Sequence, residues 1–146
     1  MARYIVSTTV TPTDGEDIMT LVSAASRRLR IAQVTVGGVG TTSAAQGLIV
    51  TRSSGGTSGG GALTSRKFDS ADQPSAAATV NTTWTGQPTI EAEGEEMVWN
   101  SLGGSNRWIP PRGEGFEVRD GGQISIRAKV AATFQPCRVT VIYDED

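Results

Sequence analysis

Short stretches in which apolar and polar side chains alternate recur along the chain, and this period of two most limits the folds open to it. The clearest stretches are rich in Val, Ile and Thr and cover 3–10, 28–36, 123–130 and 138–143. Successive side chains of a strand point to opposite faces of its sheet, so this alternation is typical of half-buried strands. Clusters of Gly, Pro, Asn and Asp separate the stretches and favour turns. The pattern predicts an all-β protein.

No repeat or linker divides the 146 residues, so we expect a single domain over 1–146. Further strands are expected at 16–25, 46–52, 62–68 and 97–102. About eight or nine short strands in a domain of this size suit an antiparallel β-sandwich. We expect a jelly roll, and an immunoglobulin-like sandwich and a small barrel are the alternatives.

The strongest local signal is the sequence Asp120-Gly121-Gly122, which lies between stretches 116–118 and 123–130. Asp-Gly is typical of a tight hairpin turn, so we expect these two stretches to pair. In the second strand the Ile and Ala side chains and Val130 are expected to face the core, and the intervening Gln, Ser, Arg and Lys side chains to face water.

Two other segments interrupt the strand pattern. Residues 53–61 are Ser, Thr and Gly only, which predicts a flexible loop. They lack the Gly-Lys-Ser or Gly-Lys-Thr ending of a phosphate-binding loop, so we do not expect nucleotide binding there. Residues 107–112 contain two consecutive prolines, which have no amide hydrogen for a sheet, so this segment is expected at an edge or in a crossover.

Composition excludes several functions. The chain has no His, so it cannot form a Ser-His-Asp triad or a His-ligated metal site from its own residues. Its single Cys, Cys137, cannot form an internal disulfide, and its place in an alternating stretch favours a buried apolar role over a reactive thiol. We therefore expect a protein that is not an enzyme and has no cofactor or small-molecule substrate.

The charge balance is also informative. Thirteen Lys and Arg residues against 15 Asp and Glu residues give a net charge of −2, which argues against a dedicated nucleic-acid partner. No apolar run is long enough to span a membrane, and the first residues lack the pattern of a secretory signal, so we expect no membrane association.

One acidic concentration lies inside the chain, at Glu91, Glu93, Glu95 and Glu96. Its spacing differs from that of a calcium-binding loop, so we prefer a solvated strand face to a calcium site. A glycosidase would also need two carboxylates across a sugar-sized cleft, and the sequence gives no sign of such a cleft.

The three tryptophans are candidates for protein contacts, because Trp and Arg are enriched in the parts of interfaces that contribute most to binding. Trp99 lies in an apolar stretch and is expected in the core. Trp84 and Trp108 lie among polar or Pro-rich residues. For these two we keep two alternatives, a place at the edge of the core and a place in a subunit interface.

Several short motifs together resemble one family. They are Met1-Ala2-Arg3-Tyr4, Arg27-Arg28-Leu29-Arg30-Ile31, Asp69-Ser70-Ala71-Asp72 before Thr82-Thr83-Trp84-Thr85, Pro110-Pro111-Arg112, and Asp120-Gly121-Gly122-Gln123. In these features the chain resembles the capsid decoration, or cement, proteins of tailed bacteriophages. The resemblance implies a structural virion protein with a jelly-roll fold, often a homotrimer. Such a protein is made in the host cytoplasm, binds the major capsid protein on the outer capsid surface and stabilises the shell.

The resemblance suggests which residues make contacts. We expect residues 1–13 to act as an N-terminal arm, or the loop 53–61 to reach a neighbour, by adding a strand to an open sheet edge. The expected interface residues are Arg3, Tyr4, Trp84, Arg107, Trp108 and Arg112. Two alternatives remain, a tail, baseplate or receptor-binding component and a carbohydrate-binding module.

Overall fold

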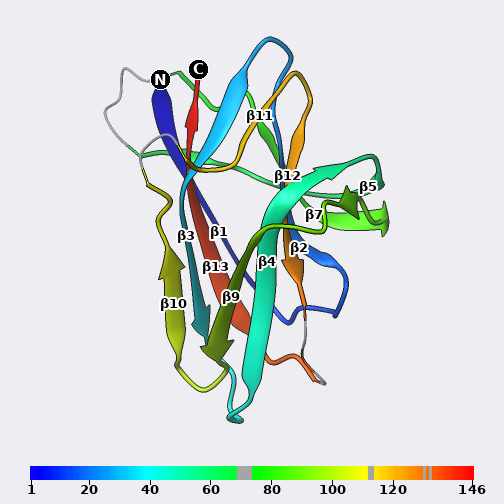
Figure 1. Cartoon of the computed structure of the whole chain (residues 1–146), viewed down its shortest axis with the longest axis vertical. Coiled ribbons are helices and arrows are strands. Elements are labelled where there is room, and N and C mark those ends of the chain that lie inside the picture. Colours follow the sequence, from blue (N-terminus) through cyan, green and yellow to red (C-terminus); the bar gives the residue numbers. More distant parts are fainter. Residues whose placement is uncertain (69–73, 112–113, 130, 132) are drawn as a thin grey trace.

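The computed structural model of the chain describes residues 1–68, 74–111, 114–129, 131 and 133–146. In these residues the regular structure consists of strands, which form two antiparallel sheets packed face to face (Figure 1). The expected all-β, antiparallel sandwich is confirmed.

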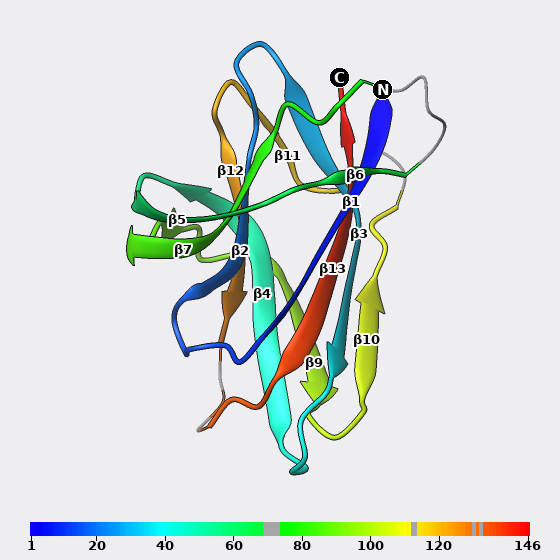
Figure 2. The same ribbon diagram turned by 180° about the vertical axis from the view of Figure 1, so that it is seen from behind.

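Sheet A contains the first and the last strand and has the order β10-β3-β13-β1-β6, with β11 also paired to β3. Its strands are β1 (Ala2–Val10), β3 (Arg28–Gly38), β6 (Arg66–Lys67), β10 (Ser105–Trp108), β11 (Glu117–Arg119) and β13 (Cys137–Glu145). Seen from behind, β1, β13 and β3 run side by side along the molecule (Figure 2).

Sheet B has the order β5-β7-β2-β12-β4-β8, with β9 also paired to β4. Its strands are β2 (Asp17–Val22), β4 (Ala45–Ser54), β5 (Thr57–Leu63), β7 (Thr79–Gly86), β8 (Thr89–Ile90), β9 (Glu95–Asn100) and β12 (Gln123–Ala128). The strands expected at 16–25, 46–52 and 97–102 are thus found as β2, β4 and β9. The stretch 62–68 is divided between the end of β5 and the short β6.

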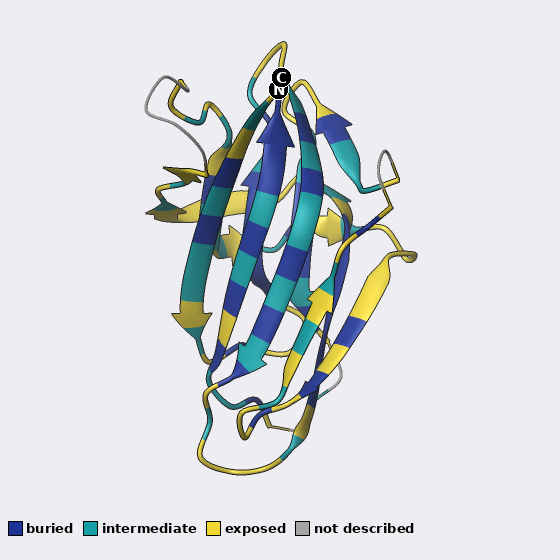
Figure 3. Ribbon diagram, turned by 90° about the vertical axis from the view of Figure 1, so that its left-hand side faces the viewer, coloured by how far each residue is buried: buried dark blue, intermediate teal, exposed yellow. Residues whose placement is uncertain are grey.

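The core lies between the sheets and is built from alternate residues of their strands, as the bands of buried and half-buried residues in Figure 3 show. In β12, Ile124, Ile126 and Ala128 are fully buried, as expected, and Val130 lies outside the described residues. The expectation for the other face was wrong, because Ser125 is also fully buried and the Arg127 side chain is mostly covered. Another part of the chain covers the outer face of sheet B.

The turn at 119–122 has the expected conformation, but the two strands that it connects do not pair with each other. Asp120 and Gly121 have φ angles of 50° and 82°, which suit a tight turn of the Asp-Gly type, and the Gly122 N–H donates to the Arg119 carbonyl. However, β11 pairs with β3 in sheet A and β12 lies in sheet B. The predicted hairpin is wrong, and the turn carries the chain from one sheet to the other.

Two segments expected to be free are part of the sheets. Residues 1–13 are not a free arm, because β1 pairs with β13 along its whole length, from Ala2 with Glu145 to Val10 with Cys137. Residues 53–61 are not a flexible loop, since β4 ends at Ser54 and β5 begins at Thr57 and pairs with β7. Ladder hydrogen bonds with distant strands order both segments, which composition alone does not reveal.

Ile126→Asp is expected to prevent folding, because Ile126 is fully buried in the middle of sheet B and an unpaired carboxylate there costs more than about 4 kcal/mol. Circular dichroism and thermal unfolding will measure the effect. Val98→Asp is the matched control. Val98 lies in the same sheet, on β9, but its side chain is 70% exposed. A folded Ile126→Asp variant with an unchanged melting temperature would contradict the assigned face.

Candidate docking surfaces

The expected interface residues do not form one surface. Tyr4 was expected at an interface, but it is 1% exposed, packs against Tyr143 with 5.5 Å between ring centroids, and donates from its hydroxyl to the Pro74 carbonyl at 2.8 Å. Burial raises its pKa, because the charged phenolate would lose its hydration. Tyr4 is a core residue, since alternation along β1 turns it inward next to the exposed Arg3.

Trp84 lies on β7 and is half-buried, and its indole N–H donates to the Thr20 hydroxyl at 2.9 Å. It therefore lies on the outer face of sheet B, because Thr20 in turn donates to the Asp17 carboxylate there. Trp108 is also half-buried and faces the Phe116 ring at 5.7 Å, whereas Arg107 beside it is exposed. Arg112 lies outside the described residues.

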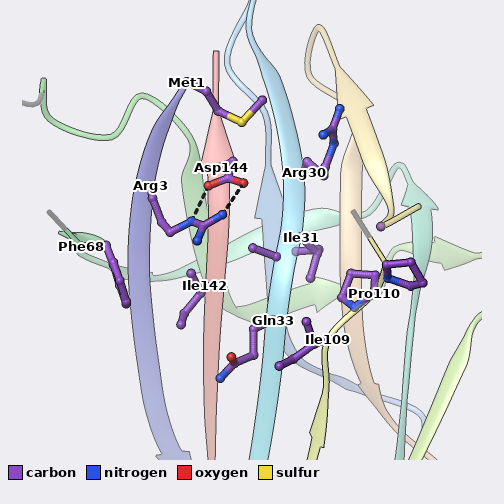
Figure 4. Close-up of a pocket in the computed structure, with 13 residues that line it drawn as sticks. Met1, Arg3, Arg30, Ile31, Gln33, Phe68, Ile109, Pro110, Ile142 and Asp144 are labelled. Carbon is purple, nitrogen blue, oxygen red and sulfur yellow. Dashed lines mark hydrogen bonds and ion pairs between the residues drawn. The ribbon is translucent and has the colours of Figure 1, made fainter. Parts of the chain in front are cut away.

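Arg3 lines a hollow of about 680 Å³ on the outer face of sheet A (Figure 4). Its guanidinium makes two hydrogen bonds to the Asp144 carboxylate on β13, at 2.7 and 3.0 Å. Phe68 flanks the hollow on one side and Ile109 on the other. Met1, Phe68 and Ile109 are three of the six large apolar side chains that are exposed in the described residues. The hollow is therefore partly apolar but contains charged side chains.

A second hollow, of about 460 Å³, combines aromatic and acidic side chains. Trp108 and Phe116 lie on it, and the Arg52 guanidinium sits 5.8 Å from the centre of the Phe116 ring. Four carboxylates also line it, those of Glu91, Glu93, Glu95 and Glu114. Part of the acidic concentration seen in the sequence thus lies next to an aromatic pair.

The end of the sandwich opposite the termini is formed by the connections β1–β2 (11–16), β3–β4, β9–β10 and β12–β13 (Figure 1). Three stretches of these connections, 39–44, 101–104 and 133–136, lie against one another, and we call these three stretches the loop end. Hydrogen bonds tie the loops together, from the Gly40 N–H to the Ser101 carbonyl at 2.9 Å and from the Val39 N–H to the Pro136 carbonyl at 3.0 Å. Gly38 allows this close approach, because a Cβ atom there would collide with the carbonyls of residues 100 and 101.

The loop end is notable for its composition. The sequence has no Asp, Glu, Lys or Arg in 31–51, 97–106 or 131–137, which together include these three stretches. Charged residues at this end lie beside them, Asp14 and Glu16 in the connection 11–16 and Lys129 directly after β12. Two large apolar side chains are exposed there, Val39 at 53% and Leu102 at 57%. Depletion of charge together with exposed apolar side chains is typical of the central part of a protein interface.

The opposite end, next to the termini, is highly charged. Glu117 on β11 forms ion pairs with Arg28, Arg30 and Arg119, and the shortest, to Arg30, is 2.7 Å. The hydrogen bond from Arg30 lowers the pKa of the Glu117 carboxyl, and the other arginines lower it further. Charged groups that are already paired and hydrated make this end suited to solvent.

Sequence reasoning missed a buried polar cluster on the outer face of sheet B, centred on Asp17. The Asp17 carboxylate accepts hydrogen bonds from Thr20 and Ser125, both at 2.5 Å, and from Arg127 at 2.7 Å. Arg127 also donates to the Pro88 carbonyl, and the Gln87 side chain accepts from the Asp17 N–H. The cluster fastens the segment after β7 across sheet B, which explains why both faces of β2 and β12 are buried.

Cys137 is fully buried at the start of β13, which confirms the apolar role expected for it. Burial raises the pKa of its thiol to about 11, because the thiolate would be poorly solvated. In the ranges that the structure describes, no three His, Cys, Asp or Glu residues are grouped so that they could hold a metal ion. Those ranges also contain no helix that is long and apolar enough to cross a membrane.

Comparisons with protein-family models, with curated proteins and with solved structures found no match to this chain.

Asp17→Ala is expected to destabilise the fold by about 3 to 5 kcal/mol, because it leaves a mostly buried guanidinium and two buried hydroxyls without their acceptor. Urea unfolding followed by tryptophan fluorescence measures this. Glu96→Ala removes the exposed ion pair with Lys129 and should cost less than about 1 kcal/mol. Equal losses for the two variants would show that the Asp17 cluster does not hold the sheet.

Proposed function

We propose that this chain is a non-enzymatic structural protein of a phage virion that docks on the outer surface of the capsid, with the major capsid protein as its partner. The observation that carries the proposal is the loop end, whose three stretches contain no charged residue and expose Val39 and Leu102. The resemblance of the short motifs to capsid decoration proteins gives the class of partner. The trimer that the resemblance implies stays a prediction.

The loop end suits docking better than the hollow on sheet A. A partner that covers the hollow must desolvate Arg3, Arg30 and Asp144, and the desolvation cost of such groups offsets much of the attraction between them. A partner that covers Val39 and Leu102 displaces water from apolar and uncharged surface, which favours binding. Docking through the loop end leaves the charged end in solvent.

We also propose that the sandwich is a jelly roll, which the strand order supports. Eight strands can be counted in chain order as β1, β2, β3, β4, β9, β10, β12 and β13. In this count, sheet A reads 6-3-8-1 and sheet B reads 2-7-4-5. This interleaving of consecutive strands between two sheets supports a jelly roll, a fold found among viral capsid proteins.

The docking proposal predicts that Leu102→Asp weakens binding of the purified protein to phage heads by about 10- to 100-fold, because an unpaired carboxylate would be buried at the contact. Co-sedimentation with heads that lack the protein measures this. Phe68→Asp is the matched control, since Phe68 is 53% exposed but lies on the sheet A hollow. Electron microscopy of intact particles should find the protein on the head. Its absence from heads, or equal losses for both variants, would contradict the proposal.

A second candidate function is carbohydrate binding, as in a tail or receptor-binding component. The hollow at Trp108 and Phe116 favours it, because a sugar ring can stack on an aromatic side chain while carboxylates accept hydrogen bonds from its hydroxyl groups.

If this second function holds, the purified protein binds glycans, and Trp108→Ala weakens binding by about tenfold through loss of ring contact. A glycan array followed by calorimetry tests it. Trp84→Ala serves as the control, because Trp84 hydrogen-bonds Thr20 outside this hollow. Absence of glycan binding would remove this candidate and leave the docking proposal unaffected.

A further inference from the structure

The edge of sheet A along β1 is open for half its length. In the described part of the chain, β6 pairs with β1 only at Tyr4 and Ile5, and the following residues, 6–10, have no strand on that side. On the other side these residues are fully paired with β13, without a bulge. Figure 2 shows β1 continuing past β6 as the outermost long strand of the sheet. The open edge therefore belongs to a regularly paired strand that β13 holds in place.

This edge also lacks the features that normally prevent pairing with another chain, which are charges, prolines and bulges. Residues 4–13 contain no charged residue, and the first proline is Pro12, beyond the end of β1. Other outer strands have such features. β9 contains Glu95 and Glu96, β10 contains Arg107, and the register of β5 shifts twice against β7.

We propose that the open edge of β1 pairs with the same edge of a second copy of this chain, antiparallel and about a two-fold axis near Thr8. In this arrangement Val6 faces Val10 of the second copy, Ser7 faces Thr9, and Thr8 faces itself. Pairing centred elsewhere would use fewer residues, because Ile5 is already paired with Arg66 and the strand ends at Val10. The proposal concerns the free protein and does not depend on capsid docking, and it predicts a dimer where the resemblance implies a trimer.

The backbone groups have the orientation that this pairing needs. The Arg3 carbonyl accepts a hydrogen bond from the Phe68 N–H, so it points to the β6 side. Orientation alternates along a strand, which turns the N–H and C=O groups of Ser7 and Thr9 to the same, open side. In the proposed register Ser7 of each copy lies opposite Thr9 of the other copy. The N–H and C=O groups that these residues turn to the open side can therefore all form hydrogen bonds between the two copies.

The side chains match as well. Val6 is buried in the core and Val10 packs against it, so pairing these residues extends the apolar layer of each sandwich into the other. Ser7 and Thr9 alternate with them and lie on the outer face, where hydroxyl groups pair well across strands. A two-fold contact sets a surface against itself, and this one brings no like charges together.

Sedimentation equilibrium and light scattering on the purified chain test the proposal. We expect a reversible dimer. Thr9→Pro removes an N–H that points to the open side and adds a ring there, so the dimer dissociation constant should rise at least about tenfold while the monomer stays folded. Thr9→Val is the matched control, because it keeps the amide and should leave the dissociation constant within about twofold. A monomeric wild-type protein, or a dimer unaffected by Thr9→Pro, overturns the proposal.

A cross-linking experiment tests the register. Thr8 faces itself at a non-hydrogen-bonded position, where Cα atoms are about 4.5 Å apart, close enough for a disulfide. Thr8→Cys should therefore give a covalent dimer under mild oxidation. Thr9→Cys should not, because Thr9 faces Ser7 of the second copy. Equal cross-linking of the two variants, or none of Thr8→Cys in a dimeric protein, contradicts this register. Phage heads are not needed, so failure here is distinct from failure of capsid docking.

Discussion

The antiparallel pairing of β1 with β13 is the constraint on which the rest of the structure depends. It joins the first and last strands along nine residue pairs, and β3 then pairs with the other side of β13. The same register stacks Tyr4 on Tyr143 in the core and sets Arg3 opposite Asp144 on the outer face. Because β13 lies inside sheet A, β1 is left near the border of the sheet, with one side open.

The sequence predicted the strands that have one face in the core, because burial of one face leaves a period of two. β1, β3 and β13 are of this kind. β5 has no buried face and consists mostly of Gly, Ser and Thr, so its sequence is indistinguishable from a flexible loop. The turn at Asp120 was predicted in conformation but not in partners, since turn angles depend on local residues and strand pairing depends on distant ones.

The candidate surfaces were less predictable. The outer face of sheet B reads as solvated in sequence, and only the crossing of the segment after β7 buries Asp17 and Ser125. The lack of charge in 31–51 and 97–106 is visible in the sequence, but its importance depends on the topology that brings these loops to one end. The two ends of the molecule therefore differ, with the paired charges around Glu117 at one end and the uncharged stretches of the loop end at the other.

The joining of the first and last strands also affects how the protein acquires its structure. Arg3 and Asp144 are 141 positions apart, and contacts of such long sequence separation slow folding because a large loop must close before they form. During translation, β1 has to wait until residues 137–145, its partners along its full length, have been made. Until β13 is made, both edges of residues 6–10 lack a partner strand, whereas in the folded protein β13 covers one of them.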